Sequence, residues 1–141
     1  MATSIIDKAL QAILKMLGKK DERVLLWENA SPTSSFSAQS IDIDGTGYDS
    51  YRVTAYNRGD TIEIDIPVGG AGAFRDFTHD TGTQTEGVYL WTRHITTTAS
   101  KVTFEKAWLR LTNSATYSTD SSQDMLIPQK VYGIKSSGGA N

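Results

Sequence analysis

The hydrophobic period of this chain changes once, from helical near the N-terminus to strand-like after residue 23. Four large apolar residues recur at alternating spacings of four and three: Ile6, Leu10, Ile13 and Leu17. This spacing places them on one face of a helix over residues 4–17. The change of period divides the chain into an N-terminal association helix at residues 1–20, a β-domain at residues 21–135 and a small-residue tail at residues 136–141 that we expect to be flexible.

The β-domain is predicted from repeated alternation of apolar and polar residues. The clearest case is residues 61–67, where three isoleucines alternate with Thr61, Glu63 and Asp65. We expect strands near 24–27, 36–43, 51–56, 61–67, 87–97, 101–111 and 126–135, with a weaker one at 73–77. Seven or eight antiparallel strands favour a mainly β protein, a jelly-roll-like β-sandwich preceded by one short helix. We expect long loops at 69–87 and 112–124, and long loops commonly carry function.

Composition removes several classes of function. The chain has 14 basic and 16 acidic residues and a net charge of −2, which provides no basic surface for nucleic acid. It has no cysteine, so disulfides and thiolate metal sites are absent. Its apolar stretches are short, so we expect no membrane insertion and no signal peptide.

Metal binding and catalysis have little support in the residue pattern. Residues 42–49 place three carboxylates around a glycine turn, which is a pattern of calcium ligands, but the EF-hand spacing is missing and Asp-Gly is also an ordinary hairpin turn. With two histidines that are far apart, a zinc site is disfavoured. No nucleophile-elbow or metalloprotease motif occurs. We therefore expect no enzyme, no catalytic residue, no metal and no cofactor.

Aromatic side chains next to polar loops are the best binding candidates. Flat rings stack on sugar faces, and neighbouring carboxylates and guanidinium groups bond hydroxyls. The aromatic candidates are Tyr48, Tyr56, Tyr89, Trp91 and Tyr117. With the charged residues of the 69–87 segment, the predicted saccharide-binding set is Arg75, Asp76, His79, Tyr89 and Trp91. For each aromatic residue, packing in the core is the alternative.

Three segments in order along the chain resemble a known group of proteins. They are Leu25-Leu26-Trp27-Glu28-Asn29 with the following Pro32-Thr33-Ser34-Ser35-Phe36-Ser37-Ala38-Gln39, then Pro67-Val68-Gly69-Gly70, and finally Ile127-Pro128-Gln129-Lys130-Val131-Tyr132-Gly133-Ile134. The pattern resembles β-rich minor structural proteins of tailed bacteriophages and prophages of Gram-positive bacteria. The resemblance implies a virion component, assembled in the bacterial host cytoplasm, from a tail fibre, baseplate or head fibre. It supplies no catalytic residues, and physical reasoning makes Trp27 and Phe36 core anchors.

The residues and the resemblance together give one leading expectation. We expect a phage virion structural or adhesion module that either holds a neighbouring structural protein or recognises a host-surface saccharide. The helix, through Ile6, Leu10, Ile13 and Leu17, is expected to make it a homo-oligomer. A trimer is preferred because of the resemblance to phage fibres. Packing of the helix on its own sandwich, a head-fibre or capsid decoration protein without a receptor, and a small glycan-processing enzyme remain the alternatives.

Overall fold

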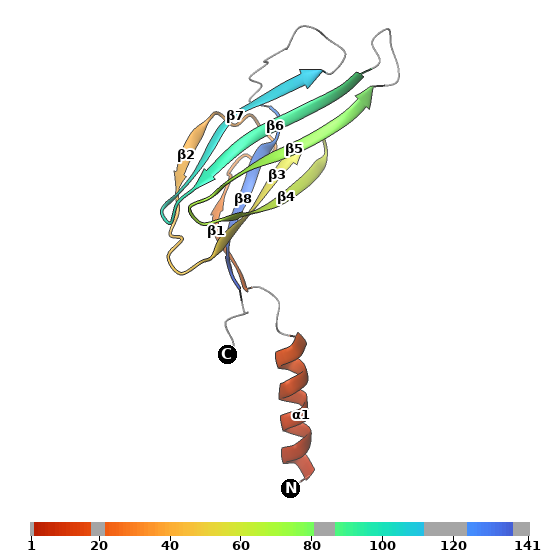
Figure 1. Cartoon of the computed structure of the whole chain (residues 1–141), viewed down its shortest axis with the longest axis vertical. Coiled ribbons are helices and arrows are strands. Elements are labelled where there is room, and N and C mark those ends of the chain that lie inside the picture. The colour runs from red at the N-terminus through yellow and green to blue at the C-terminus, as the bar shows by residue number, and fades with distance from the viewer. Residues whose placement is uncertain (1, 18–21, 81–86, 112–123, 137–141) are drawn as a thin grey trace.

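The computed structural model describes residues 2–17, 22–80, 87–111 and 124–136. It contains one N-terminal helix and two four-stranded antiparallel sheets that stack as a sandwich (Figure 1). The elements are α1 (Ala2–Leu17), β1 (Glu22–Glu28), β2 (Gln39–Asp42), β3 (Ser50–Asn57), β4 (Asp60–Pro67), β5 (Ala71–Asp80), β6 (Gly87–Thr97), β7 (Lys101–Leu111) and β8 (Ile127–Lys135). The predicted fold class is confirmed.

The strand order is β1-β8-β3-β4 in one sheet and β2-β7-β6-β5 in the other. The outer pairs β1/β8 and β2/β7 lie in different sheets, as nested strands do in a jelly roll, whereas β3–β4 and β5–β6–β7 are hairpins within a sheet. Glu22 pairs with Lys135, so the chain enters and leaves the sandwich at the same end. We call this the proximal end, and the opposite end, which holds Asn57 and Ile127, the distal end.

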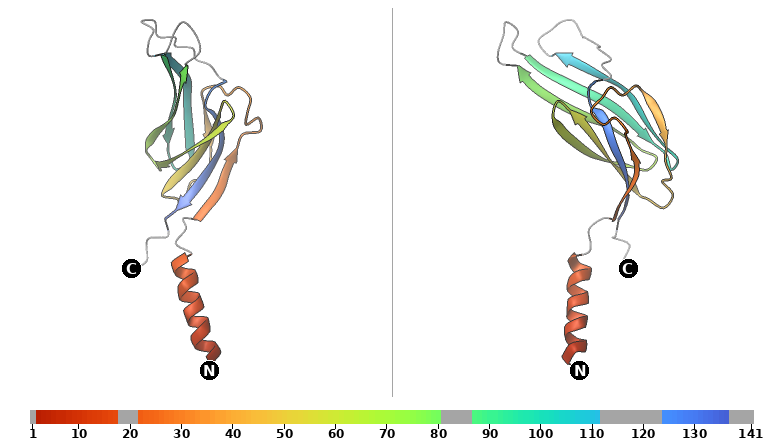
Figure 2. Two further views of the ribbon diagram at one scale, coloured as in Figure 1. Left: turned by 90° about the vertical axis from the view of Figure 1, so that its right-hand side faces the viewer. Right: turned by 180° about the vertical axis from the view of Figure 1, so that it is seen from behind.

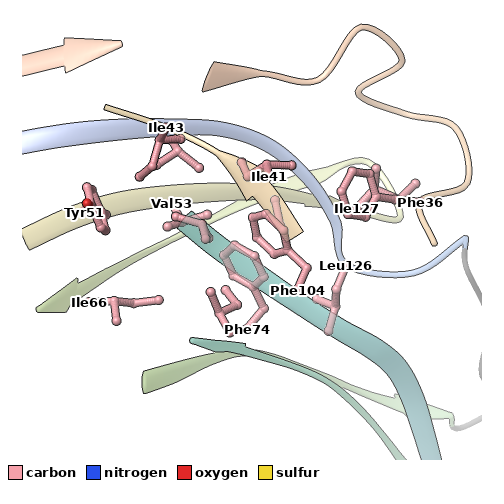
Figure 3. Close-up of a cluster of buried hydrophobic side chains, with 14 of the residues drawn as sticks. Phe36, Ile41, Ile43, Tyr51, Val53, Ile66, Phe74, Phe104, Leu126 and Ile127 are labelled. Atoms are coloured by element: carbon pink, nitrogen blue, oxygen red, sulfur yellow. The ribbon is translucent and has the colours of Figure 1, made fainter. Parts of the chain in front are cut away.

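The core lies between the two sheets and is built from the inward positions of the alternating strands. Trp27, Phe36 and Phe104 form an aromatic cluster with ring centroids 5.5–6.1 Å apart. Phe36 and Phe104 are buried and Trp27 is half-buried, so the prediction that Trp27 and Phe36 anchor the core is confirmed. Figure 3 shows the aliphatic side chains around them: Ile41, Ile43, Val53, Ile66, Leu126 and Ile127.

The expected long loop at 69–87 is wrong for most of its length. Ala71–Asp80 is a ten-residue strand, β5, which pairs with β6 over its whole length. The alternation there is weak because the inward positions include Gly72 and Asp76, while the outward Phe77 is 71% exposed. Ladder bonds to β6, which periodicity cannot reveal, hold this strand. Residues 81–86 of the expected loop, and 112–123 of the other one, lie outside the described residues.

The helix α1 extends away from the sandwich instead of covering a sheet (Figures 1 and 2). Its predicted apolar face is open to solvent in this single chain, with Ile6, Leu10 and Ile13 at 65%, 52% and 53% exposed. The side chain of Leu17 lies outside the described residues. The packing of α1 on its own sandwich is therefore not seen in the structure. No helix in the described part of the chain combines the length and the apolarity needed to cross a membrane.

Ser136, the first residue of the segment expected to be flexible, is held by the sandwich. Its backbone N–H and its Oγ both donate to Asp49 Oδ2, at 2.9 and 3.0 Å. These bonds, together with the charge of Lys135, lower the pKa of the Asp49 carboxyl below its usual value. The flexibility of the tail stays a prediction, and residues 137–141 lie outside the described residues.

Candidate ligand pocket

The strands β5, β6 and β7 run past the other sheet at the distal end and leave part of their inner face uncovered by it (Figures 1 and 2). A pocket of about 510 Å³ lies there, within the range of small-molecule sites. We call it the distal pocket. It is lined by Arg58, Thr78, His79, Tyr89, Trp91, Leu109 and Met125. The distal pocket therefore combines residues of β5, β6 and β7 with Arg58 of the β3–β4 turn and with Met125, which precedes β8.

Two stacked aromatic rings form one wall of the distal pocket. Tyr89 and Trp91 are two residues apart on β6, so both point to the inner face of the sheet. Their ring centroids are 6.0 Å apart and the rings are 22° from parallel. Tyr89 is half-buried, while Trp91 is only 4% exposed. Such a wall offers a flat apolar surface with a phenol group, which suits a ligand with one apolar and one hydroxylated face.

Arg58 approaches this wall from the other sheet. Its guanidinium carbon lies 5.3 Å from the centre of the Trp91 ring, within the range of a cation–π contact. The residue belongs to the turn between β3 and β4, and it is exposed. The distal pocket thus has a positive charge next to its aromatic wall.

A network of hydrogen bonds next to the distal pocket joins the end of β3 to β5 and to the residue before β8. Asn57, which is 1% exposed, donates through Nδ2 to Asp76 Oδ2 at 2.7 Å. The backbone N–H of Leu126 donates to Asn57 Oδ1 at 3.4 Å, and that of Phe77 donates to Asp76 Oδ1 at 2.8 Å. Asp76 therefore ties two strands together and does not line the distal pocket.

Two residues next to this network have strained, left-handed backbone conformations. Among the described residues, the non-glycine residues with positive φ are Arg58, at 51°, and Leu126, at 48°. Arg58 lines the distal pocket, and Leu126 follows Met125, which also lines it. Asn57 precedes Arg58 in the chain and accepts the hydrogen bond of Leu126. Side chains other than glycine, asparagine and aspartate rarely adopt this conformation, and it clusters at functional sites.

A buried arginine, Arg93, lies next to the distal pocket and bonds three backbone carbonyl groups. It lies on β6 two residues from Trp91 and is fully buried. Its Nη1 donates to Glu105 O at 2.8 Å, and its Nη2 donates to the carbonyls of Phe36 at 3.2 Å and Met125 at 3.1 Å. Burial lowers the pKa of Arg93 to about 10, so the group stays protonated at neutral pH. Through Met125, it fixes one border of the distal pocket.

The structure brings together three of the five predicted saccharide-binding residues. His79, Tyr89 and Trp91 line the distal pocket. Asp76 pairs with Trp91 but is not among the residues that line the distal pocket, whereas Arg75 pairs with Thr92 on the opposite face of β5 and is exposed. Sequence reasoning missed Arg58, Thr78, Leu109 and Met125. Leu109 and Thr78 share the inward phase of their strands, but nothing in the sequence places the Arg58 turn beside Trp91.

Two of the other aromatic candidates, Tyr48 and Tyr56, pack within the fold. Tyr56 packs against the core, and the ring of Tyr48 lies so close to Gly133 that an added Cβ there would be 2.6 Å from it. Tyr117 lies outside the described residues. Among the four aromatic candidates that the structure describes, only Tyr89 and Trp91 line the distal pocket.

The carboxylates of residues 42–49 have separate partners. Asp42 pairs with Lys101 at 2.6 Å, Asp44 accepts from the N–H of Thr46 at 3.3 Å, and Asp49 bonds Ser136. Within the described residues, no group of three or more potential metal ligands gathers. The turn is held by hydrogen bonds and one ion pair of its own.

No protein-family model, curated protein or solved structure matches this chain. The distal pocket and its position relative to α1 are therefore the observations on which a function can be based.

Proposed function

We propose that this chain is an appendage module of a tailed bacteriophage virion, attached through α1 and binding a host-surface saccharide in the distal pocket. The observation that carries this proposal is the placement of the two features at opposite ends. Glu22 pairs with Lys135 at the proximal end, so α1 precedes the sandwich there (Figure 1). The residues that line the distal pocket lie at the other end. A module held at one end with a pocket at the other suits attachment to a surface.

The chemistry of the distal pocket supports a sugar as ligand. The half-buried Tyr89 ring, stacked beside the buried Trp91, presents an apolar surface to the C–H face of a sugar ring. Thr78, His79 and the Tyr89 hydroxyl supply hydrogen-bonding groups at the same place. A mostly apolar wall with a few polar groups is typical of small-ligand sites.

The phage setting is supported by the resemblance of the three sequence segments. In the structure these segments belong to the framework: Trp27 packs on Phe36, Gly70 N–H donates to Pro67 O at 2.9 Å, and the last segment forms β8. None of their residues is among the described residues that line the distal pocket. The resemblance thus bears on the setting, and the distal pocket bears on the ligand.

The exposed face of α1 supports assembly of several copies. Three large apolar side chains, Ile6, Leu10 and Ile13, are more than half exposed in the single chain. A helix of 16 residues is marginal in water unless its apolar face is buried. The four-and-three spacing suits packing of parallel helices, so we propose a homotrimer around α1. Light scattering of the full chain measures this, and a monomer contradicts it.

Binding of the full-length protein to host cells and to a glycan panel tests the function. We expect Tyr89→Ala to weaken saccharide binding at least ~10-fold, because it removes the half-buried ring of the aromatic wall. Tyr132→Ala is the matched control, since Tyr132 lies on β8 in the other sheet and contacts Arg23 at 3.8 Å. Undiminished binding by Tyr89→Ala would overturn the assignment of the distal pocket. Absence of cell and glycan binding would instead favour a head decoration protein.

A further inference from the structure

We propose that the distal pocket selects acidic saccharides, meaning sugars with a carboxylate or phosphate group, and that Arg58 recognises the negative charge. This inference rests on the proposed function and names the ligand class of the same pocket. Its evidence comes from the backbone of one turn, the position of one guanidinium group and the charges around it.

The turn between β3 and β4 is unfavourable for arginine. Asn57 pairs with Asp60, so Arg58 and Gly59 form a two-residue hairpin loop. Their φ angles are 51° and 97°, and positive φ at both positions is the pattern of a type I′ turn. This turn favours Asn or Gly at its first position, because a larger side chain is strained at positive φ. The turn itself gives no reason for arginine, which points to a role for the side chain.

The side chain of Arg58 is placed to bind an anion. Its guanidinium lies 5.3 Å from the Trp91 ring centre, and a planar group beside an aromatic ring keeps N–H groups at its edge for other partners. Arg52 by contrast pairs with Asp65 at 2.7 Å, and Arg23 pairs with Glu63 at 3.2 Å. Among the described residues, Arg58 has no such ion pair. Arginine binds carboxylate and phosphate groups through two parallel hydrogen bonds.

The charged residues that line the distal pocket in the described part of the chain are of one sign. Of the described residues that line it, Arg58 and His79 are basic, and none is acidic. The nearest carboxylate in the adjoining network, Asp76, accepts hydrogen bonds from Asn57 and Phe77. An acidic ligand would therefore meet Arg58 without displacing an internal partner. A neutral sugar would stack on the aromatic wall without using the charge.

Asn57 fixes the turn that carries Arg58. It is buried, and its side chain bonds both the Asp76 carboxylate and the N–H of Leu126. A side chain held at both ends of its amide keeps the adjacent turn in one conformation before ligand binds. Such preorganisation lowers the entropy lost on binding. Asn57 is accordingly a positioning residue for Arg58.

The substitution Arg58→Asn separates binding from folding. Asparagine suits the first position of a type I′ turn, so we expect the melting temperature of the variant to rise by roughly a few degrees. We expect its affinity for acidic saccharides to fall at least ~10-fold, since a charge-assisted pair is lost. A residue with only a structural role would not produce a more stable protein that binds more weakly.

Two matched probe pairs identify the recognised group in titration calorimetry with the full-length protein. One pair is oligogalacturonate and the same oligomer with its carboxyl groups reduced. The other is a malto-oligosaccharide phosphorylated at O6 and its dephosphorylated counterpart. We expect the wild type to prefer at least one acidic probe over its neutral partner at least ~10-fold, and to lose this preference as salt rises. The pair that shows the preference distinguishes carboxylate from phosphate recognition.

Arg75→Asn is the control, because Arg75 is exposed on the opposite face of β5 and its removal changes the net charge equally. We expect this variant to bind like the wild type. Equal wild-type affinity for the acidic and neutral members of both pairs would overturn the inference while leaving saccharide binding intact. Unchanged acidic binding by Arg58→Asn, or a lower melting temperature, would also overturn it. If none of the four probes and no member of the glycan panel binds, the proposed function fails.

Discussion

The two ends of the sandwich place their strained backbone in different residues. At the proximal end, positive φ angles fall on Gly47 and Gly69, where they cost little. At the distal end they fall on Gly59 and also on Arg58 and Leu126, where a left-handed conformation costs ~1–2 kcal/mol for each residue. The proximal end is therefore built for stability. The distal end keeps side chains that its turns do not favour, as binding sites commonly do.

The two ends also differ in how many side chains make their hydrogen bonds. At the proximal end, bonds are spread over several segments: Tyr51 Oη donates to Thr98 O at 2.8 Å, Thr97 Oγ1 donates to Pro67 O at 2.8 Å, and Asp49 holds Ser136. At the distal end, two buried side chains, Asn57 and Arg93, make most of the long-range side-chain bonds that we have described. Loss of one side chain should therefore matter more at the distal end.

The largest expected effect comes from Arg93→Ala. Three carbonyl groups, the buried one of Phe36 and the part-buried ones of Glu105 and Met125, would lose their donor. An unsatisfied buried group costs ~1–3 kcal/mol, so we expect the free energy of unfolding to fall by about 3–5 kcal/mol. Urea denaturation measures it.

Two further variants control this experiment. Arg75→Ala, at an exposed position on the neighbouring strand, should change stability by less than ~0.5 kcal/mol. Arg93→Lys keeps the charge without the planar fork, so its stability should lie between that of Arg93→Ala and that of the wild type. A loss below ~1 kcal/mol in Arg93→Ala would show that the distal end does not depend on this side chain.

A smaller effect is expected from Gly69→Ala at the proximal end. A Cβ added at Gly69 meets no atom within 4 Å, so the cost comes from its φ of 81° alone. We expect the free energy of unfolding to fall by about 1 kcal/mol, measured by the same denaturation. The sign should be opposite to that of Arg58→Asn at the distal end. A loss in both variants would remove the contrast between the two ends.

The smallest effect on stability is expected from lowering the pH, and it should come from carboxylates at the proximal end. The pKa of Asp49 is lowered in the folded state by the two Ser136 bonds, so its contribution to stability is complete above pH ~4 and is lost as pH falls through the folded pKa. Asp65, whose pKa is lowered by the hydrogen bonds of Arg52, acts in the same direction. Arg93 adds no slope below its pKa of about 10, because it is protonated in both states there.

Melting temperatures between pH 5 and pH 2.5 measure this effect. We expect Asp49→Asn to melt lower than the wild type at pH 5 and to depend less on pH below 4, because the variant has no carboxylate to protonate at this site. Identical pH profiles for the two proteins would show that the Ser136 bonds do not stabilise the fold.

Sequence periodicity predicts strands where burial alternates cleanly. The bounds of β6 (Gly87–Thr97) and β7 (Lys101–Leu111) agree with the expected ranges, because apolar residues occupy most of their inward positions, with the buried Arg93 as an exception. The strand expected at 36–43 is shorter, with β2 at Gln39–Asp42. Phe36 is buried as a strand residue would be, but its carbonyl accepts from Arg93. An apolar residue type therefore predicts that the side chain is buried, but it does not predict which group its backbone bonds.

The distal pocket is partly predictable for a similar reason. His79, Tyr89 and Trp91 come from neighbouring strands of one hairpin, and local reasoning selected all three. Arg58 and Met125 reach the distal pocket from the other sheet and from the residues before β8. Their positions depend on strand order, which residue spacing does not encode. The sequence signal at Arg58 was the Asn-Arg-Gly-Asp turn, whose significance appears only with its φ angles.

The pairing of Glu22 with Lys135 makes this sandwich suitable for transplantation into other proteins. Paired residues on neighbouring antiparallel strands lie ~5 Å apart, a gap that one surface loop of a recipient protein can span. Residues 22–135 can therefore be grafted into such a loop through both ends at once. The recipient would then lie at the proximal end, and the distal pocket would stay open to its surroundings.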